Sequence, residues 1–217
     1  MVLIILTGIL IIIFLINYFL YWIIFLKTER KKSEAWDKYT KIYLTFWLIP
    51  IISIPIITSG FFAPFLGTVS YFQEILLWFI LLGIILVILG LKFRSSAMKV
   101  NKIKGLAKGN YRLVEKSVYQ IMRHPMNFSW AMIFLGLALI FDSLIALIIT
   151  PFFFLFLEFE GFMEEKYLLI PKFGEEYKKY KEMTSKRLFP TPYNILLIII
   201  AIFIIYVGVL NFFITPI

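Results

Sequence analysis

The chain has 217 residues, of which 61% are hydrophobic, 19% aromatic and only 16% charged. Soluble domains are about half apolar and about a quarter charged, so this composition indicates an integral membrane protein. The 22 Lys and Arg against 13 Asp and Glu give a net charge of +9, which a membrane location explains without a nucleic acid partner. With no cysteine and one histidine, the chain is expected to have no disulfide, no thiolate nucleophile and no metal site.

Apolar stretches long enough to form membrane helices recur along the chain. A helix needs about 20 apolar residues to cross a hydrocarbon core of about 30 Å. The first stretch is longer than a signal-peptide core and lacks a basic leader, so we expect it to be retained. The sequence therefore predicts an all-α, polytopic membrane protein with six transmembrane helices, at Leu3–Leu26, Ile42–Gly60, Tyr71–Leu91, Asn127–Phe141, Ser143–Phe159 and Tyr193–Phe213.

The fourth and fifth predicted helices meet at Asp142 and Ser143, so we expect them to form a tight helical hairpin. No internal repeat or linker divides the chain, and residues 1–217 are predicted to form one membrane domain. Within it we expect three N-terminal spans over 3–91, a core over 92–190 and a C-terminal span over 191–217.

The basic residues fall into three of the predicted loops. Six Lys or Arg lie within Lys27–Lys41, nine within Lys92–Arg123 and seven within Lys166–Arg187, which accounts for all 22. The loops around Phe61–Ser70 and at Asp142 carry none. The positive-inside rule therefore predicts that the three basic loops are cytoplasmic and both termini lie outside, with the cell membrane as the expected location.

An Arg-His-Pro triplet, Arg123 to Pro125, directly precedes the fourth span. Proline suits the first turn of a helix, so Arg123 and His124 are expected at the helix start. The unpaired N–H groups and the positive dipole end at such a start suit a carboxylate or a phosphate. Alternatively, Arg123 snorkels to lipid headgroups and His124 only caps the helix.

Four carboxylates, Glu158, Glu160, Glu164 and Glu165, follow the apolar fifth span. Carboxylates at membrane depth are costly and indicate a functional site. Glu160 and Glu164 lie one turn apart on the same helix face. Because a hairpin returns the chain to the side it left, this acidic turn and the Arg-His-Pro triplet are expected to be neighbours. Alternatively, Glu164 and Glu165 mark a helix end that emerges into water and pairs with Lys166.

The last basic loop carries an apolar stripe with helical spacing, formed by Phe173, Tyr177, Tyr180 and Met183. This spacing predicts an amphipathic helix at the membrane surface.

Several of these motifs occur together in one known family. LVEKSVYQIMRHPMNFSW is followed by the apolar hairpin, then EEKYL, then FGEEYKKYKEMTSKRLFP. This order resembles the isoprenylcysteine carboxyl methyltransferase family and its wider group, which includes phospholipid N-methyltransferases. The resemblance covers about Tyr111 to Pro190 and includes an EExxL pattern at Glu164 and an FGxEY pattern at Phe173. Related nicotinamide-dependent membrane reductases also carry the triplet, but the EExxL and FGxEY patterns argue against them.

The resemblance implies a membrane enzyme that transfers a methyl group from S-adenosylmethionine to a lipophilic acceptor taken from the bilayer. A zwitterionic cofactor has a carboxylate that suits a helix N-terminus and cationic groups that suit Glu164. The resemblance implies that the cofactor pocket is lined by Tyr111, Arg112, Leu113, Val114, Tyr119, His124, Pro125, Met126, Asn127 and Glu164.

Three positions depart from the family pattern. The family usually has Gly where this chain has Ser117, Tyr where it has Asn127, and Arg where it has Glu160. An anion in place of that Arg would repel a carboxylate by a few kcal/mol, on the order expected in a partly dry site. We therefore expect an amine or a neutral acceptor, with Glu160 or Glu158 orienting or deprotonating it.

Glu160 and Arg123 are the candidate catalytic residues. In one alternative the acceptor is a carboxylate, which Arg123 or Arg187 would hold. In a second, the protein is a phospholipid N-methyltransferase. In a third, it is a non-catalytic membrane protein that kept the fold, which the changes at Ser117 and Asn127 favour.

Overall fold

The computed structural model describes residues 2–28, 48–59, 76–104, 113, 115–188, 195, 198–199, 201–202 and 206. The described residues form helices and no strand, as the sequence predicts. The elements in chain order are α1 (Val2–Thr28), a helix at Leu48–Ile57, α4 (Leu76–Lys104), the 3₁₀ turn η2 (Ser117–Gln120), α5 (Pro125–Ile140), α6 (Leu144–Glu164), the π turn η3 (Glu165–Leu169), α7 (Ile170–Phe173) and α8 (Glu175–Met183).

Two helices in the described part are long and apolar enough to cross a membrane. They are Leu77–Val100, with a mean hydropathy of 2.2, and Leu144–Phe173, with a mean hydropathy of 1.9. Length and composition thus support two spans, and the six-span topology stays a prediction. The predicted span Tyr193–Phe213 lies largely outside the described residues. Shorter apolar helices occupy Ile5–Leu20, Leu48–Ile57 and Pro125–Ile140.

Two helices are longer than their apolar stretches predict. α4 continues past Leu91 to Lys104, because Lys, Arg, Ser and Met continue a helix after the hydrophobic stretch ends. The fifth predicted span continues past Phe159 through the π turn to Phe173, where Gly174 has a φ of +52° and ends the helix. The end of a hydrophobic stretch therefore does not mark the end of the helix in this protein.

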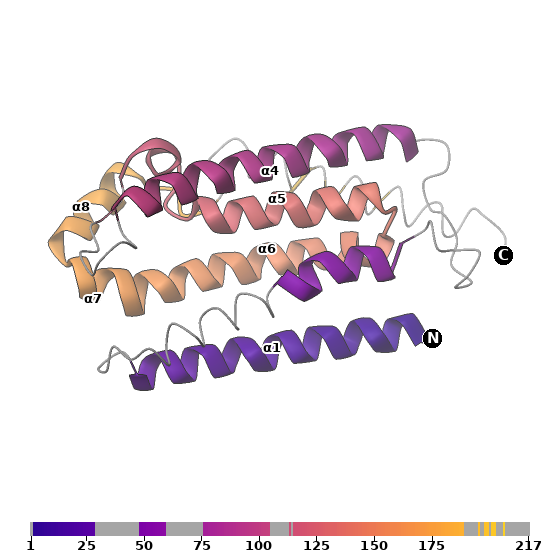
Figure 1. The fold of residues 1–217 in the computed structure, drawn as a ribbon, viewed down its shortest axis with the longest axis horizontal. Helices are drawn as coiled ribbons and strands as arrows, with labels where there is room; N and C mark the ends of the chain where they lie inside the picture. The colour runs from indigo at the N-terminus through magenta and orange to yellow at the C-terminus, as the bar shows by residue number, and fades with distance from the viewer. Residues whose placement is uncertain are drawn as a thin grey trace.

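α4 and α5 lie against each other along a glycine seam (Figure 1). A Cβ atom built on Gly136 would lie 2.7 Å from the carbonyl oxygen of Gly83, and one on Gly90 would lie 2.9 Å from that of Ser129. The two contacts are about two helical turns apart on each helix. Only small residues allow helix backbones to approach this closely, and such seams are typical of helices packed within membranes.

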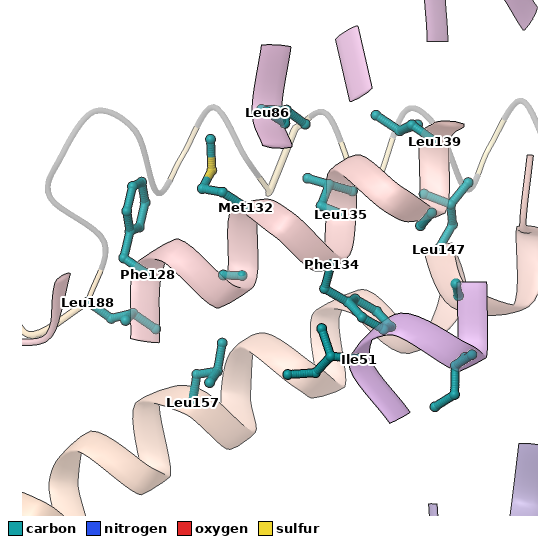
Figure 2. Packing of buried hydrophobic residues seen from close by; sticks show 14 of the residues in the cluster. Ile51, Leu86, Phe128, Met132, Phe134, Leu135, Leu139, Leu147, Leu157 and Leu188 are labelled. Carbon is teal, nitrogen blue, oxygen red and sulfur yellow. The ribbon is translucent and has the colours of Figure 1, made fainter. Parts of the chain in front are cut away.

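α5 is the central helix of the core. Phe128, Met132, Phe134, Leu135 and Leu139 all project from it and are buried (Figure 2). Their packing partners include Leu86 of α4, Leu157 of α6 and Ile51 of the helix Leu48–Ile57. A helix that is apolar on all sides is expected in such a buried position.

The predicted hairpin between α5 and α6 is present. Asp142 has a φ of +49°, which turns the chain, and the Ser143 side chain caps α6 by accepting a hydrogen bond from the Ala146 N–H at 3.1 Å. The hydroxyl of Ser143 also contacts the hydroxyl of Thr58. The turn makes α6 run back beside α5, so the end of α6 returns to the start of α5 (Figure 1).

Aromatic side chains join α1 to α6. The rings of Phe14 and Tyr18 pack edge-on against Phe156, with centroid distances of 5.0 and 4.6 Å. Beyond these contacts, the ring centroids of Trp22 in α1 and Tyr167 in the π turn η3 lie 6.4 Å apart. The two helices run parallel, and the C-terminal half of α1 therefore lies beside the end of α6, where the acidic turn is.

Candidate active site

The hairpin brings the Arg-His-Pro triplet and the acidic turn into direct contact, as predicted. The His124 Nδ1 atom lies 3.1 Å from Glu164 Oε2, and the Arg123 Nε atom lies 2.8 Å from Glu165 Oε1. His124 is the N-cap residue of α5 and Pro125 is its first residue, as the sequence predicts. These contacts join residues about forty positions apart, and the pairing depends on the hairpin geometry.

Glu165 is the centre of the ion-pair cluster. Its side chain is 3% exposed, and its Oε1 atom accepts hydrogen bonds from Arg123 Nε at 2.8 Å and from Arg187 Nε at 3.1 Å. The Nε2 atom of His124 lies 3.3 Å from the same oxygen. A buried carboxylate requires such compensation. The sequence marked Glu165 only as the second residue of a Glu-Glu doublet, and its central position depends on the fold.

His124 is buried between two carboxylates. Burial alone lowers the pKa of a histidine, but hydrogen bonds and charge interactions with Glu164 and Glu165 outweigh it and raise the pKa of His124 to about 9. The imidazole is therefore a cation at neutral pH and donates a hydrogen bond from each ring nitrogen. The Glu164 side chain is 35% exposed and so lies at the rim of this cluster.

One carboxylate of the acidic turn forms no direct ion pair with a described residue, although the His124 cation acts on it from a distance. Glu158 pairs with Arg187 at 3.2 Å, while Glu164 and Glu165 pair with His124. Glu160 instead accepts a hydrogen bond from the neutral Asn127 amide, with 2.5 Å between Asn127 Nδ2 and Glu160 Oε2. Asn127 and Glu160 are two of the three departures from the family pattern, and the structure shows that they are partners.

A short segment after α8, residues 184–188, crosses the start of α5. We call it the strap. The backbone N–H groups of Arg123 and His124 donate to the carbonyl oxygens of Lys186 and Arg187, at 3.0 and 2.9 Å, and the side-chain Nη1 of Arg123 donates to those of Thr184 and Ser185. Leu188 is fully buried in the core. These two N–H groups are therefore used inside the protein and do not meet a ligand.

Gly161 allows the strap to pack against α6. A Cβ atom at this position would lie 3.0 Å from Arg187 Cδ and 3.2 Å from His124 Cδ2. Contacts this short require the Arg187 and His124 atoms to give way by a few tenths of an ångström, so a side chain here would press on the ion-pair cluster.

α8 packs its apolar face against the protein. Tyr177 and Tyr180 are buried with Leu113, and the Tyr180 hydroxyl donates to the Tyr119 carbonyl oxygen at 2.7 Å. Burial raises the pKa of both phenols, which stay neutral. The prediction of a helix anchored on the membrane surface is therefore wrong for most of the stripe, because a protein core covers it, and only Met183 is 70% exposed.

The structure describes seven of the predicted cofactor residues: Leu113, Tyr119, His124, Pro125, Met126, Asn127 and Glu164. The other three, Tyr111, Arg112 and Val114, lie outside the described residues. The seven described residues fall into two groups. Leu113 and Tyr119 belong to the small core beneath α8, and the other five lie at the start of α5 and the end of α6.

Ser117 has a φ of +63°, in the left-handed region that favours glycine. The Gly that the family usually has at this position is therefore explained by the backbone. The serine keeps the same turn with some strain, so this departure does not change the path of the chain.

Comparison with known proteins agrees with the motifs. Residues 78–176 match the family model described as phospholipid methyltransferase, a range that begins in α4 and ends in α8. No match was found among curated proteins or solved structures. The matched range contains the triplet, the hairpin and the acidic turn, whose side chains form the cluster described above. Over residues 78–176 the chain is therefore similar to the phospholipid methyltransferase family.

Proposed function

We propose that this protein is an S-adenosylmethionine-dependent methyltransferase that methylates an amine of a lipid acceptor. The observation that carries this proposal is the carboxylate of Glu160. It lies on an apolar helix, and it alone among the four carboxylates of the acidic turn forms no ion pair with a described residue. A carboxylate at membrane depth is costly unless a cation compensates it, and a ligand amine would supply that cation.

The residues at the start of α5 fit the cofactor by the chemistry of their donors. The partly exposed Glu164 would bind the cationic end, while Met126 and Asn127 lie in the first turn of α5, whose dipole favours a carboxylate. When bound, S-adenosylmethionine supplies an electrophilic methyl group on a sulfonium. His124 would hold Glu164 in place through its 3.1 Å contact. Leu113, Tyr119 and Pro125 would add apolar walls, with Tyr111, Arg112 and Val114 as further lining residues.

Glu160 would act on the acceptor. An ammonium group has no lone pair for attack, so the amine must lose a proton before or during transfer. The Glu160 carboxylate would take that proton, and Asn127 would orient the carboxylate through its hydrogen bond to Oε2. With the proton on Glu160, the nitrogen lone pair would be free to accept the methyl group that the cofactor would supply. The chain otherwise positions the partners and excludes water, for which the strap and α8 provide a cover.

A carboxylate acceptor fits less well. Arg123 and Arg187, the two candidate cations, both bind Glu165, and Arg123 also binds two strap carbonyls. Neither guanidinium is left to hold a substrate carboxylate. Arg123, expected from the sequence as a catalytic residue, is thus better explained as a positioning residue that fixes the strap over the helix start.

We also infer that the chain forms one six-span membrane domain with its basic loops in the cytoplasm. Support comes from the positions of the described basic residues, which lie after the apolar part of α4, before α5 and after α6, at one end of the helices (Figure 1). In this arrangement the cofactor reaches the site from the cytoplasm and the acceptor from the cytoplasmic leaflet of the cell membrane.

Methyl transfer by the purified protein in nanodiscs tests the proposal. The assay follows labelled methyl groups from S-adenosylmethionine to a panel of lipid amines and prenylcysteine acids. We expect methylation of the amines and a loss of at least a hundredfold in kcat for Glu160→Gln, since the general base is removed. Strong methylation of the acids would contradict the proposal. A non-catalytic protein would show neither transfer nor stabilisation by S-adenosylhomocysteine, which should reach about 2.7 kcal/mol at 100 times its Kd.

A further inference from the structure

α1 places a tyrosine beside the acidic turn, outside the range that matches the family. Tyr18 is 2% exposed, although its helix is mostly covered with exposed Ile and Leu side chains. Its ring packs edge-on against Phe156 of α6, with 4.6 Å between centroids. Phe156 and Glu160 are one turn apart, so both project from the same face of α6. Tyr18 therefore lies on the Glu160 side of α6, and the two groups interact electrostatically.

The hydroxyl of Tyr18 has no hydrogen-bond acceptor among the described residues. Trp22, one turn along α1, interacts with the phenol, but an indole N–H only donates and so cannot accept the phenol hydrogen. A buried hydroxyl without an acceptor is unfavourable, and such groups are rare in native proteins. A phenylalanine would pack equally well against Phe156, so packing alone does not account for the hydroxyl.

We propose that Tyr18 is an acceptor-binding residue whose hydroxyl donates a hydrogen bond to an oxygen of the lipid headgroup, next to the amine that Glu160 binds. This inference rests on the proposed function and narrows the acceptor to lipid amines that carry an oxygen close to the amine, as a phosphodiester does. A bare alkyl amine offers Glu160 its charge but gives Tyr18 no oxygen.

Binding measurements on the full chain in detergent test this inference without depending on activity. The variant Tyr18→Phe removes only the hydroxyl, and Tyr206→Phe, at a position that is 60% exposed, is the matched control. Two probes are used: dihexanoyl phosphatidylethanolamine, which has both groups, and dodecylamine, which has only the amine. We expect Tyr18→Phe to weaken phosphatidylethanolamine binding about tenfold and to leave dodecylamine binding unchanged, with no effect of Tyr206→Phe.

Thermal unfolding of the ligand-free variant separates a binding role from a structural one. Because the hydroxyl lacks an acceptor, Tyr18→Phe should keep or raise the Tm, whereas loss of a structural hydrogen bond would lower it. Equal binding of phosphatidylethanolamine by the wild type and Tyr18→Phe, or an equal loss for both probes, would overturn the inference. If binding behaves as expected but the wild type transfers no methyl group, the proposed function falls and the role of Tyr18 stands.

Discussion

Replacing Glu165 with Gln should break the charge balance of the buried cluster. The substitution keeps the size of the side chain and one oxygen, but it removes the charge that faces Arg123, Arg187 and His124. The Arg123 side chain is 3% exposed, so its charge cannot be solvated by water instead. Breaking a buried ion pair from one side costs about 3 to 5 kcal/mol. Since the Gln oxygen can still accept a hydrogen bond, we expect a loss near the lower end, about 3 kcal/mol.

Glu175→Gln is the matched control for this experiment. Glu175 pairs with Lys178 at 2.5 Å, but its side chain is 78% exposed, and an exposed pair contributes about 0 to 1 kcal/mol. Both variants are unfolded in mixed micelles and followed by circular dichroism, and trypsin cleavage after Lys186 reports whether the strap has loosened. If Glu165→Gln costs no more than Glu175→Gln and the strap is cleaved no faster, the cluster does not hold this end of the protein together.

Two further predictions concern His124 in the ion-pair cluster and the glycine seam between α4 and α5. Because its pKa is raised, protonated His124 stabilises the folded protein by about 3 kcal/mol at most. This contribution is fully present below the unfolded pKa of about 6.5 and is lost as pH rises through about 9. The free energy of unfolding, measured between pH 6 and 10, should show this loss in the wild type and not in His124→Gln. Gly136→Ala should destabilise the protein by about 1 to 3 kcal/mol, because the new methyl group meets the Gly83 carbonyl oxygen, whereas Gly8→Ala, with open space around it, should not. Equal unfolding midpoints for Gly136→Ala and Gly8→Ala would contradict this prediction, because they would show that α4 and α5 can move apart without loss of stability.

The hairpin could be predicted from sequence because its signals are local. Asp142 and Ser143 interrupt two apolar stretches, and Ser143 is a favourable N-cap, so the turn and the antiparallel helices follow. The proximity of His124 and Glu164 then follows from topology alone. Helix ends were less predictable. The thickness of the membrane sets the length of the apolar stretch, but the helix can continue beyond it with polar residues, as it does after α4 and α6 leave their apolar stretches.

The roles of individual charges could not be predicted in the same way. Arg123 and Glu165 carry the residue types of a catalytic site, but their hydrogen bonds to each other and to the strap become known only when residues 123, 165 and 184–187 are placed together. The pairing of Asn127 with Glu160 also spans the hairpin and has no local signal. Tyr18 lies still further away, on a helix whose sequence looks like any lipid-facing span.

The glycine seam limits where the protein can open. Gly83 and Gly90 of α4 fit against Gly136 and Ser129 of α5 with carbonyl oxygens closer than a methyl group would permit, so these two helices cannot slide past each other in small steps. α1 meets α6 through the edge-on contacts of Phe14 and Tyr18 with Phe156, which involve side chains and not backbone atoms. A lipid tail is therefore expected to pass between α1 and α6, with α4 and α5 as the immobile wall behind it.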